Sequence, residues 1–428
     1  MRTSRLFVLA PALVVAHACR DAGARTTLDE TETISASTTV GAAPMFAVSP
    51  SVRRAVAWVS APGGGTDGRL YVTTGGPPTE LRDTLGPIEP HGEAPPKLAY
   101  ASDGSLYALY AVAKVVPGRR FPMSSLRLAK SSDDGATWTA PVTIASDSAF
   151  GTRNFHAMHA AADGSIYVAW LESNQGTSTT FLTRSTDAGV TWTTPVMADS
   201  AQSCPCCRTA IATAPDGSLY LAWRTVMPGN VRDVVVAKST DHGATWAPPV
   251  RVHADEWVFD GCPHAGPSMQ VDSAGRVHIA WWTGKQGAAG TYYAQSTDGG
   301  ESFHEPIALG VSEFSAPAHV QLALGPGGTI VTVWDDGTVK TPRVVMRVSP
   351  DGGTSFSPAT VVSTAGAAAT FPVLAVRDKD ITIAWSEQSS EVHDHAAMMA
   401  PDMKDPKAVK GLTAVGRTAV RVRTGRLH

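Results

Sequence analysis

The sequence predicts an all-β fold, a single β-propeller of four-stranded blades. Three observations lead to this prediction: a turn motif recurs five times at near-constant spacing, an apolar strand pattern precedes each copy, and Gly and Pro are abundant while charge is sparse. The chain has 428 residues with 39 Gly, 30 Pro, 43% hydrophobic and 17% charged residues. Such a composition is typical of many short strands joined by tight turns. It also supplies ample core and excludes a wholly disordered chain.

The turn motif is S-x-D-x-G-x-[TS]-[WF]. Its copies are 53 to 57 residues apart and begin at Ser131, Ser185, Ser239, Ser296 and Ser349. In each copy the Asp side chain is expected to cap backbone N–H groups, and the Gly to adopt a positive φ. The final aromatic residue should pack between neighbouring sheets. The motif therefore predicts hairpin turns with a structural role, and none of its residues is assigned to catalysis.

An apolar strand ending in Trp or Tyr precedes each turn. The five clear copies are DGSLYALY at 103, DGSIYVAW at 163, DGSLYLAW at 216, AGRVHIAW at 274 and GGTIVTVW at 327, and weaker versions are RRAVAW at 53 and DKDITIAW at 378. Each unit then holds four short strands, which is one propeller blade. The count gives seven blades within a single domain, residues 43–428. Six blades is the alternative if the two terminal units share one blade.

The N-terminus has the pattern of an export signal. Arg2 and Arg5 precede an apolar run, and Ala16-His17-Ala18 fits a small-x-small cleavage site, so residues 1–18 are predicted to be a signal peptide. Cys19 follows directly and would carry the lipid of a bacterial lipoprotein. Residues 19–42 are polar and predict a tether or a strand that closes the ring. The predicted location is outside the cytoplasm: periplasm, outer-membrane lipoprotein or secreted.

Charge excludes one class of partner. The 35 basic and 38 acidic residues give a formal net charge of −3, and no basic stripe is present. A nucleic-acid partner is therefore excluded, since phosphate binding needs concentrated positive charge. Beyond the N-terminus no apolar run reaches the roughly 18 residues that span a bilayer, so membrane contact is expected only through a lipid on Cys19. The expected state is a monomer, with a glycan or another extracellular ligand as its partner.

The five turns, known as Asp boxes, resemble those of the sialidase (neuraminidase) superfamily and other BNR-repeat propellers over roughly residues 43–400. The resemblance implies a propeller whose active site lies where the innermost strands begin, at the end opposite the Asp boxes. Known sialidases have six blades, so seven would be a departure.

Aligning the units on their Trp-ending strands places Cys, His and Arg side chains from several blades at that end. The aligned sets are Cys204 with Cys262 and His91, Cys206 with His264 and Arg153, and Arg208 with His319 and Phe155, while His156 lies slightly further along its own strand. A shared position at the starts of inner strands should bring these side chains together at one mouth of the propeller.

Two interpretations of the mouth cysteines stay open at this point. One is a site for a soft metal, copper or zinc, because thiolates and imidazoles suit these ions. Its candidate ligands are Cys204, Cys206, Cys262, His264, His319, His156 and His91. The other is a pair of structural disulfides, with Cys204–Cys262 between adjacent blades the attractive pairing. Because neighbouring strand residues point to opposite faces, Cys206 and Cys207 are not expected to face the axis together.

A second group of soft side chains occurs in EVHDHAAMMAPDM. It comprises His393, His395, Met398, Met399 and Met403. Thioethers beside imidazoles fit copper delivery, and the alternative is an outer strand and loop with core methionines.

The resemblance also implies sialidase chemistry, which needs an arginine triad, a Tyr nucleophile with a Glu partner, and an Asp acid/base. Arg153 and Arg208 supply two arms of such a triad, and Asp260 and Glu313 are candidate acid/base groups. The departures are clear: MFAVSPSVRRAVAW replaces the first-blade Phe/Tyr-Arg-Ile-Pro motif, and no Tyr stands at the mouth, since Tyr292 and Tyr293 are predicted on an outer strand.

Three functional hypotheses follow. The first is an exported sialidase-like propeller with a metal-binding mouth that stores the metal or uses it in redox chemistry. The second is a glycan-acting hydrolase such as an exo-α-sialidase, and the third is a disulfide-stapled binding propeller without catalysis. If the protein is an enzyme, it is a glycosidase of the sialidase type or has a metal-dependent activity.

Overall fold

A computed structural model describes residues 26–35, 39–41, 44–49, 54–62, 67–89, 91–118, 122–144, 151–174, 177–388 and 418–428. The predicted signal peptide, Cys19 and the His/Met-rich segment 391–403 lie outside the described residues. Within these ranges no helix has the length and apolar character needed to cross a membrane. The helices described are two short 3-10 turns, η1 (Pro228–Asn230) and η2 (Pro326–Gly328).

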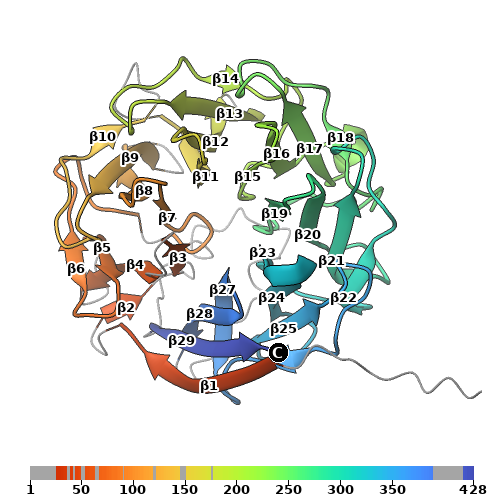
Figure 1. The fold of residues 1–428 in the computed structure, drawn as a ribbon. Coiled ribbons are helices and arrows are strands. Elements are labelled where there is room, and N and C mark those ends of the chain that lie inside the picture. Colours follow the sequence, from red (N-terminus) through yellow and green to blue (C-terminus); the bar gives the residue numbers. More distant parts are fainter. Residues whose placement is uncertain are drawn as a thin grey trace, which may run out of the picture.

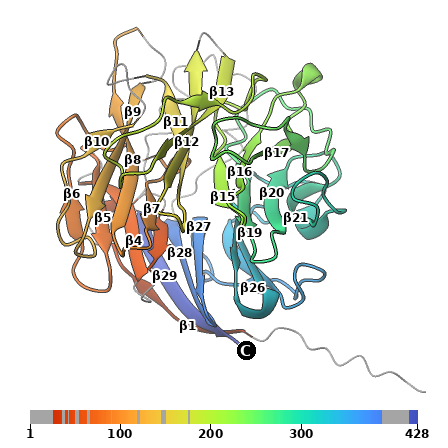
Figure 2. The ribbon, with the colours of Figure 1, turned by 45° about the horizontal axis from the view of Figure 1, so that its top comes forward.

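Seven antiparallel sheets stand in a ring, which confirms the all-β propeller and the count of seven blades (Figure 1). We number the blades 1 to 7 in chain order. In blades 2 to 7 the strands lie progressively outward from the inner strand, which is β7, β11, β15, β19, β23 or β27, and in blade 1 the inner strand is β3 while β2 lies further out. The tilted view in Figure 2 shows the inner strands β7, β11, β15, β19 and β27 around the same axis.

Blades 1 to 4 come first in the chain. Within a blade the strands are named from the axis outward, apart from β2 in blade 1. Blade 1 has β2 (Thr39–Gly41) and β3 (Met45–Val48), which both pair with β4 (Arg54–Pro62), then β5 (Arg69–Thr73) and β6 (Thr79–Leu81). Blade 2 has β7 (Lys97–Tyr100), β8 (Leu106–Lys114), β9 (Met123–Ser131) and β10 (Val142–Thr143). Blade 3 has β11 (Arg153–Ala160), β12 (Ile166–Asn174), β13 (Thr177–Ser185) and β14 (Val196–Met197). Blade 4 has β15 (Ala210–Thr213), β16 (Leu219–Arg224), β17 (Val234–Ser239) and β18 (Val250–Arg251).

The remaining blades follow the same pattern. Blade 5 has β19 (Ser268–Val271), β20 (Val277–Thr283), β21 (Ala289–Ser296) and β22 (Ile307–Ser312). Blade 6 has β23 (Gln321–Leu324), β24 (Ile330–Asp336), β25 (Arg343–Ser349) and β26 (Thr360–Val361). Blade 7 has β27 (Ala368–Arg377), β28 (Asp380–Gln388) and β29 (Thr418–Leu427), and its outer strand is β1 (Thr26–Thr33) from the other end of the chain. The register pairs Thr26 with Leu427.

The Asp boxes form the predicted turns. In the first copy the Asp133 carboxylate accepts the Thr137 N–H at 2.8 Å, and the Gly135 N–H donates to the Ser131 hydroxyl at 2.7 Å. Gly135 has φ +84°, as the turn requires. In the last copy Gly353 is needed for a second reason, because a Cβ there would stand 2.0 Å from the Tyr293 hydroxyl.

The hydrophobic core lies between adjacent blades and not at the axis. Seven clusters of buried residues fill the seven interfaces, and the Asp-box aromatic side chains pack against five of them. Trp138, for example, packs against the cluster between blades 1 and 2. Because β9 runs parallel to β7 and each Asp box follows its third strand, the Asp boxes and the starts of the inner strands are at opposite ends of the ring. We call the end where the inner strands begin the mouth.

Candidate functional site

Four cysteines gather at the mouth, where blades 3, 4 and 5 meet. Cys204, Cys206 and Cys207 lie in the segment before β15, and Cys262 lies in the segment before β19. All four are reduced thiols, and the first three are buried. We call Cys204, Cys206, Cys207 and Cys262 the thiol cluster.

The cluster contains two sets of ligand atoms close enough to share an ion. The sulfurs of Cys204, Cys206 and Cys207 all lie within 4.8 Å of one another, and so do the ligand atoms of Cys206, Cys262 and His264. The Cys204 sulfur is 3.8 Å from that of Cys206 and 3.3 Å from that of Cys207. Cys206 belongs to both sets and therefore joins blade 4 to blade 5.

The expectation that Cys206 and Cys207 point to opposite faces is wrong. Alternation holds along a strand, but Pro205 and Cys206 form a turn that ends before β15 begins. The chain direction changes there, so both sulfurs stay within reach of Cys204. Cys207 is thus a potential ligand that the sequence pattern missed.

Two buried arginines fix the position of Cys204. Its backbone N–H donates to the Arg224 carbonyl at 2.8 Å, and Arg232 Nη1 donates to its sulfur at 3.2 Å. Hydrogen bonds from the Cys206 and Cys207 thiols, followed by the positive charges of Arg232 and Arg224, hold the pKa of Cys204 well below its usual range although burial opposes this. Burial raises the pKa of Cys206 and Cys207. The cluster thus favours one thiolate with two neutral thiol donors.

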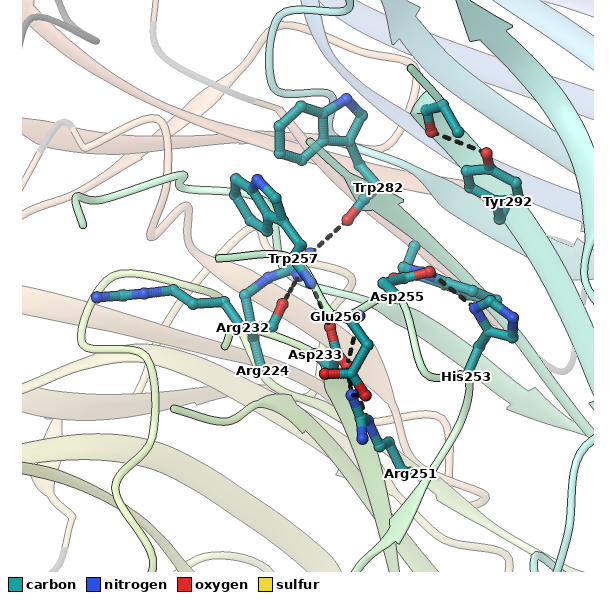
Figure 3. Close-up of polar contacts among 12 residues, drawn as sticks. Arg224, Arg232, Asp233, Arg251, His253, Asp255, Glu256, Trp257, Trp282 and Tyr292 are labelled. Carbon is teal, nitrogen blue, oxygen red and sulfur yellow. Dashed lines mark hydrogen bonds and ion pairs between the residues drawn. The ribbon is translucent and has the colours of Figure 1, made fainter. Parts of the chain in front are cut away.

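Arg224, at the end of β16, also ties blade 4 to blade 5. Its guanidinium donates to the Ala265 carbonyl at 3.0 and 3.2 Å, to the Arg232 carbonyl at 2.7 Å and to the Trp282 carbonyl, a contact visible in Figure 3. The Trp257 ring covers the guanidinium at 5.3 Å. Because Ala265 directly follows His264, this network sets the distance between the blade 4 cysteines and the Cys262–His264 segment.

The loop that carries Trp257 is held by a further buried carboxylate. Asp233 accepts Nε of Arg251 at 2.7 Å and the backbone N–H of Glu256 at 3.2 Å (Figure 3). Asp255 next accepts the Trp281 indole N–H at 2.8 Å and lies 2.9 Å from His253 Nδ1. These contacts hold the loop that carries Trp257 in place, and we assign them a structural role.

An unusual backbone conformation recurs in three blades at aromatic side chains. Phe155, His264 and Phe371 all have φ +54°, which is rare for residues other than glycine. Phe155 packs between His91 and His264, with ring centroids 5.8 and 6.5 Å away, and Phe371 lies 4.2 Å from the His319 ring. No signal in the sequence marks this conformation.

His319 is clamped between two carboxylates. Its Nδ1 is 2.6 Å from Asp335 and its Nε2 is 2.9 Å from Glu93. Burial alone would lower the pKa of His319, but the charges of Asp335 and Glu93 outweigh it and raise the pKa to about 9. The charge of His319 in turn lowers the pKa of Glu93 to about 2 against the effect of burial. Since both ring nitrogens serve ion pairs, His319 offers no free lone pair to a metal in this arrangement.

The other predicted histidine ligands also lie outside the two ligand sets found among the described residues. His91 packs on Phe155, and its Nδ1 accepts the Glu93 N–H at 3.2 Å. His156 is fully buried on β11. Of the seven predicted ligands, the structure therefore brings together Cys204, Cys206, Cys262 and His264.

The predicted catalytic groups are dispersed. Arg153 pairs with Glu172, with Nε 3.3 Å from the carboxylate. Asp260 is exposed and accepts an Asn230 hydrogen bond at 3.3 Å, and Glu313 is exposed in the loop before β23. Arg208 is buried, and the carboxylates whose charges act on it are Glu93 and Asp335. As predicted, Tyr292 and Tyr293 lie on an outer strand, β21.

Some charged groups at the mouth were not predicted. Glu172, Arg224 and Asp335 each follow the Trp that ends an apolar second strand by one or two positions. A polar residue just beyond such a Trp is therefore the sequence signal that could have found them. Lys97 and Arg232 do not follow such a Trp, so this sequence signal could not have found them.

A known protein-family model matches part of this chain. Residues 88–257 match the model of a BNR repeat-like domain. No curated protein matches the chain.

Solved structures share the fold at low sequence identity. The polysaccharide lyase Uly1 is 11% identical with a TM-score of 0.55, over 94% of this chain and 99% of its own. A PL25 ulvan lyase bound to -[GlcA(1-4)Rha3S]- is 13% identical with a TM-score of 0.53, over 77% and 87%. The endosialidase of phage phi92 is 10% identical with a TM-score of 0.50, over 93% and 69%. The shared fold confirms the β-propeller, and the repeat match agrees with the resemblance drawn from the Asp boxes: residues 88–257 of this propeller are similar to a BNR repeat-like domain.

Proposed function

We propose that the protein binds a soft metal ion, copper or zinc, at the mouth of the propeller through the thiol cluster and His264. The observation that carries the proposal is the pair of overlapping ligand sets that share Cys206. Metal–sulfur bonds of about 2.3 Å in a tetrahedral site separate the sulfurs by about 3.8 Å. The Cys204 and Cys206 sulfurs are 3.8 Å apart, so this pair fits such a site without backbone movement.

The types of ligand atom determine which metal ions the site favours. Thiolates with one imidazole favour Cu(I) and Zn(II) over the hard ions Mg²⁺ and Ca²⁺, which take oxygen ligands. Burial of the first three cysteines and the apolar contacts from Phe155 and Val226 keep the site dry. Such a setting suits storage of the metal or its use in redox chemistry.

Arg224 and Arg232 act in this proposal as positioning residues. They set the place of Cys204 and of the segment that follows His264. Outer contacts of this kind orient metal ligands and affect affinity by about 10- to 100-fold. The protein would work as an exported monomer, in the periplasm, on a membrane through a lipid on Cys19, or secreted.

Metal content by plasma mass spectrometry tests the proposal directly. The full-length protein, reconstituted with Cu(I), Cu(II) or Zn(II) under reducing conditions, should retain about one equivalent of copper or zinc. Cys206→Ser removes the member common to both ligand sets and should abolish retention, and His264→Ala should weaken it. His253→Ala is the matched control, because His253 pairs with Asp255 away from the cluster.

Two results would contradict the proposal. One is the absence of bound metal after all three reconstitutions, with the four mouth thiols reduced. The other is equal metal content in the wild type and Cys206→Ser.

A further inference from the structure

Three buried basic side chains lie on or just before the inner strands of blades 2, 3 and 4, near enough for the charge of Lys97 to act on His156 and that of Arg208 to act on Lys97. Lys97 begins β7, His156 lies in β11, and Arg208 is two residues before β15. Their exposed fractions are 9%, 0% and 7%. The Thr209 N–H and hydroxyl both approach the Phe155 carbonyl, at 3.3 and 3.4 Å, so the chain segments of Arg208 and His156 are joined.

None of the three side chains has a hydrogen-bond partner among the described residues. Both ring nitrogens of His156 are buried and unsatisfied, apart from a weak interaction with the Pro95 carbonyl. The ammonium of Lys97 and the guanidinium of Arg208 also make no hydrogen bond within the described part of the chain, but their nitrogens are not among the fully buried, unsatisfied atoms. A buried polar group without a partner is costly, so the two nitrogens of His156 point to a bound group that completes the site.

The nearby carboxylates do not fill this role. Glu93 and Asp335 act on Arg208 through their charge, but their oxygens bind His319, which is itself protonated. The positive charges of Arg208 and His319 balance the negative charges of Glu93 and Asp335. Neither carboxylate is then left to balance the charge of a protonated Lys97. In agreement with this balance, burial and the Arg208 charge lower the pKa of Lys97 well below its usual range.

We propose that a compact free anion, of the size of chloride or formate, binds between Lys97, His156 and Arg208. The guanidinium and ammonium would supply charge-assisted donors, and the imidazole a neutral N–H donor. A compact anion suits this burial, because each of the three side chains is at least nine-tenths buried. Its three donors are not among the proposed metal ligands, Arg208 directly follows Cys207 in the chain, and the anion proposal does not depend on the metal proposal.

Bromide supplies a direct probe. Crystals of the full chain grown in bromide should show one anomalous peak within hydrogen-bond distance of the Lys97 and Arg208 side chains. In solution, chloride or formate should raise the urea midpoint saturably over isethionate at constant ionic strength, because a ligand of the native state stabilises it.

Lys97→Met removes the ammonium with little change in volume and should weaken anion binding by about tenfold or more. Lys238→Met is the matched control, since Lys238 lies over the Tyr220 ring on β17, away from the axis. His156→Phe, a second variant, should also weaken binding. Cys206→Ser and chelator treatment should leave it unchanged, which separates this test from that of the metal site.

Several outcomes would overturn the proposal. These are ordered water in place of bromide, no saturable effect of chloride or formate, and equal anion affinity in wild type and Lys97→Met. Binding of glucuronate without chloride or formate would also overturn it, because the ligand would then be the head of a larger molecule.

Discussion

The ion-paired His319 makes a quantitative prediction about stability and pH. The pKa of His319 is about 9 in the folded protein, against 6.5 for an ordinary histidine. At about 1.4 kcal/mol per pKa unit, the clamp contributes about 3 kcal/mol to the free energy of unfolding. Because the folded pKa is raised, this contribution is fully present below about pH 6.5 and is lost as the pH rises to about 9.

The double variant Glu93→Gln/His319→Gln isolates this effect. Replacing His319 and Glu93 with neutral amides avoids leaving Glu93 as an unpaired buried carboxylate, whose own titration would obscure the result. Asp335, the other carboxylate of the clamp, keeps the backbone N–H groups of residue 319 and Phe371 as donors. Urea unfolding of both proteins, under reducing conditions, gives the free energy of unfolding at a series of pH values. The wild type should lose about 3 kcal/mol relative to the double variant between about pH 6.5 and about pH 9.

Parallel stability curves for the two proteins would refute this reasoning. They would mean that His319 has the same pKa in the folded and unfolded chains. A wild type that gains stability relative to the double variant as the pH rises would show that His319 is buried in its neutral form.

Three further predictions concern the supports of the mouth and the Asp boxes. Arg224→Met leaves the carbonyls of Ala265 and Trp282 without their donor, and should lower the free energy of unfolding in urea by about 3 kcal/mol or more and also weaken metal retention. Asp233→Ala removes the carboxylate that holds the loop carrying Trp257. It should lower the free energy of unfolding by about 2 kcal/mol or more and shift the tryptophan fluorescence emission. Unchanged emission would contradict this prediction. Gly353→Ala places a Cβ against Tyr293 at a positive φ and should cost about 2 to 3 kcal/mol in urea unfolding, partly recovered when Tyr293→Phe is added. A Gly353→Ala variant as stable as the wild type would contradict the close approach.

The fold was predictable because it is repetitive. Every blade has an apolar strand that ends in Trp or Tyr, and blades 2 to 6 also have an Asp-box turn after their third strand. Even the weak copies at 53 and 378 correspond to β4 and β28. Turn chemistry and strand periodicity act over a few residues, so both features of the repeat can be recognised in short stretches of sequence.

The site was predictable only in part, because its geometry departs from the repeat. Alignment on the strands brought Cys204, Cys206, Cys262 and His264 to one end, but could not foresee that Cys206 lies in a turn. Nor could it show that His319 meets Glu93, since those residues are 226 positions apart and their contact depends on ring closure. The positive φ of His264 and Phe371 is a similar departure, which no repeat of the sequence marks.

The outer strand of blade 7 has a kinetic consequence. β1 pairs with β29 (Figure 1). The Thr27 and His428 side chains, 401 positions apart, are 3.0 Å from each other. Contacts of such length form slowly, because the loop between them must be closed before they contribute any stability. During synthesis blades 1 to 6 can assemble in order, while the last sheet must wait for β29 (Thr418–Leu427). We expect the nascent protein to remain an open arc, with β1 and β28 unpaired on the sides that β29 will fill, until β29 has been made, and a chaperone that shields strand edges would act at that stage.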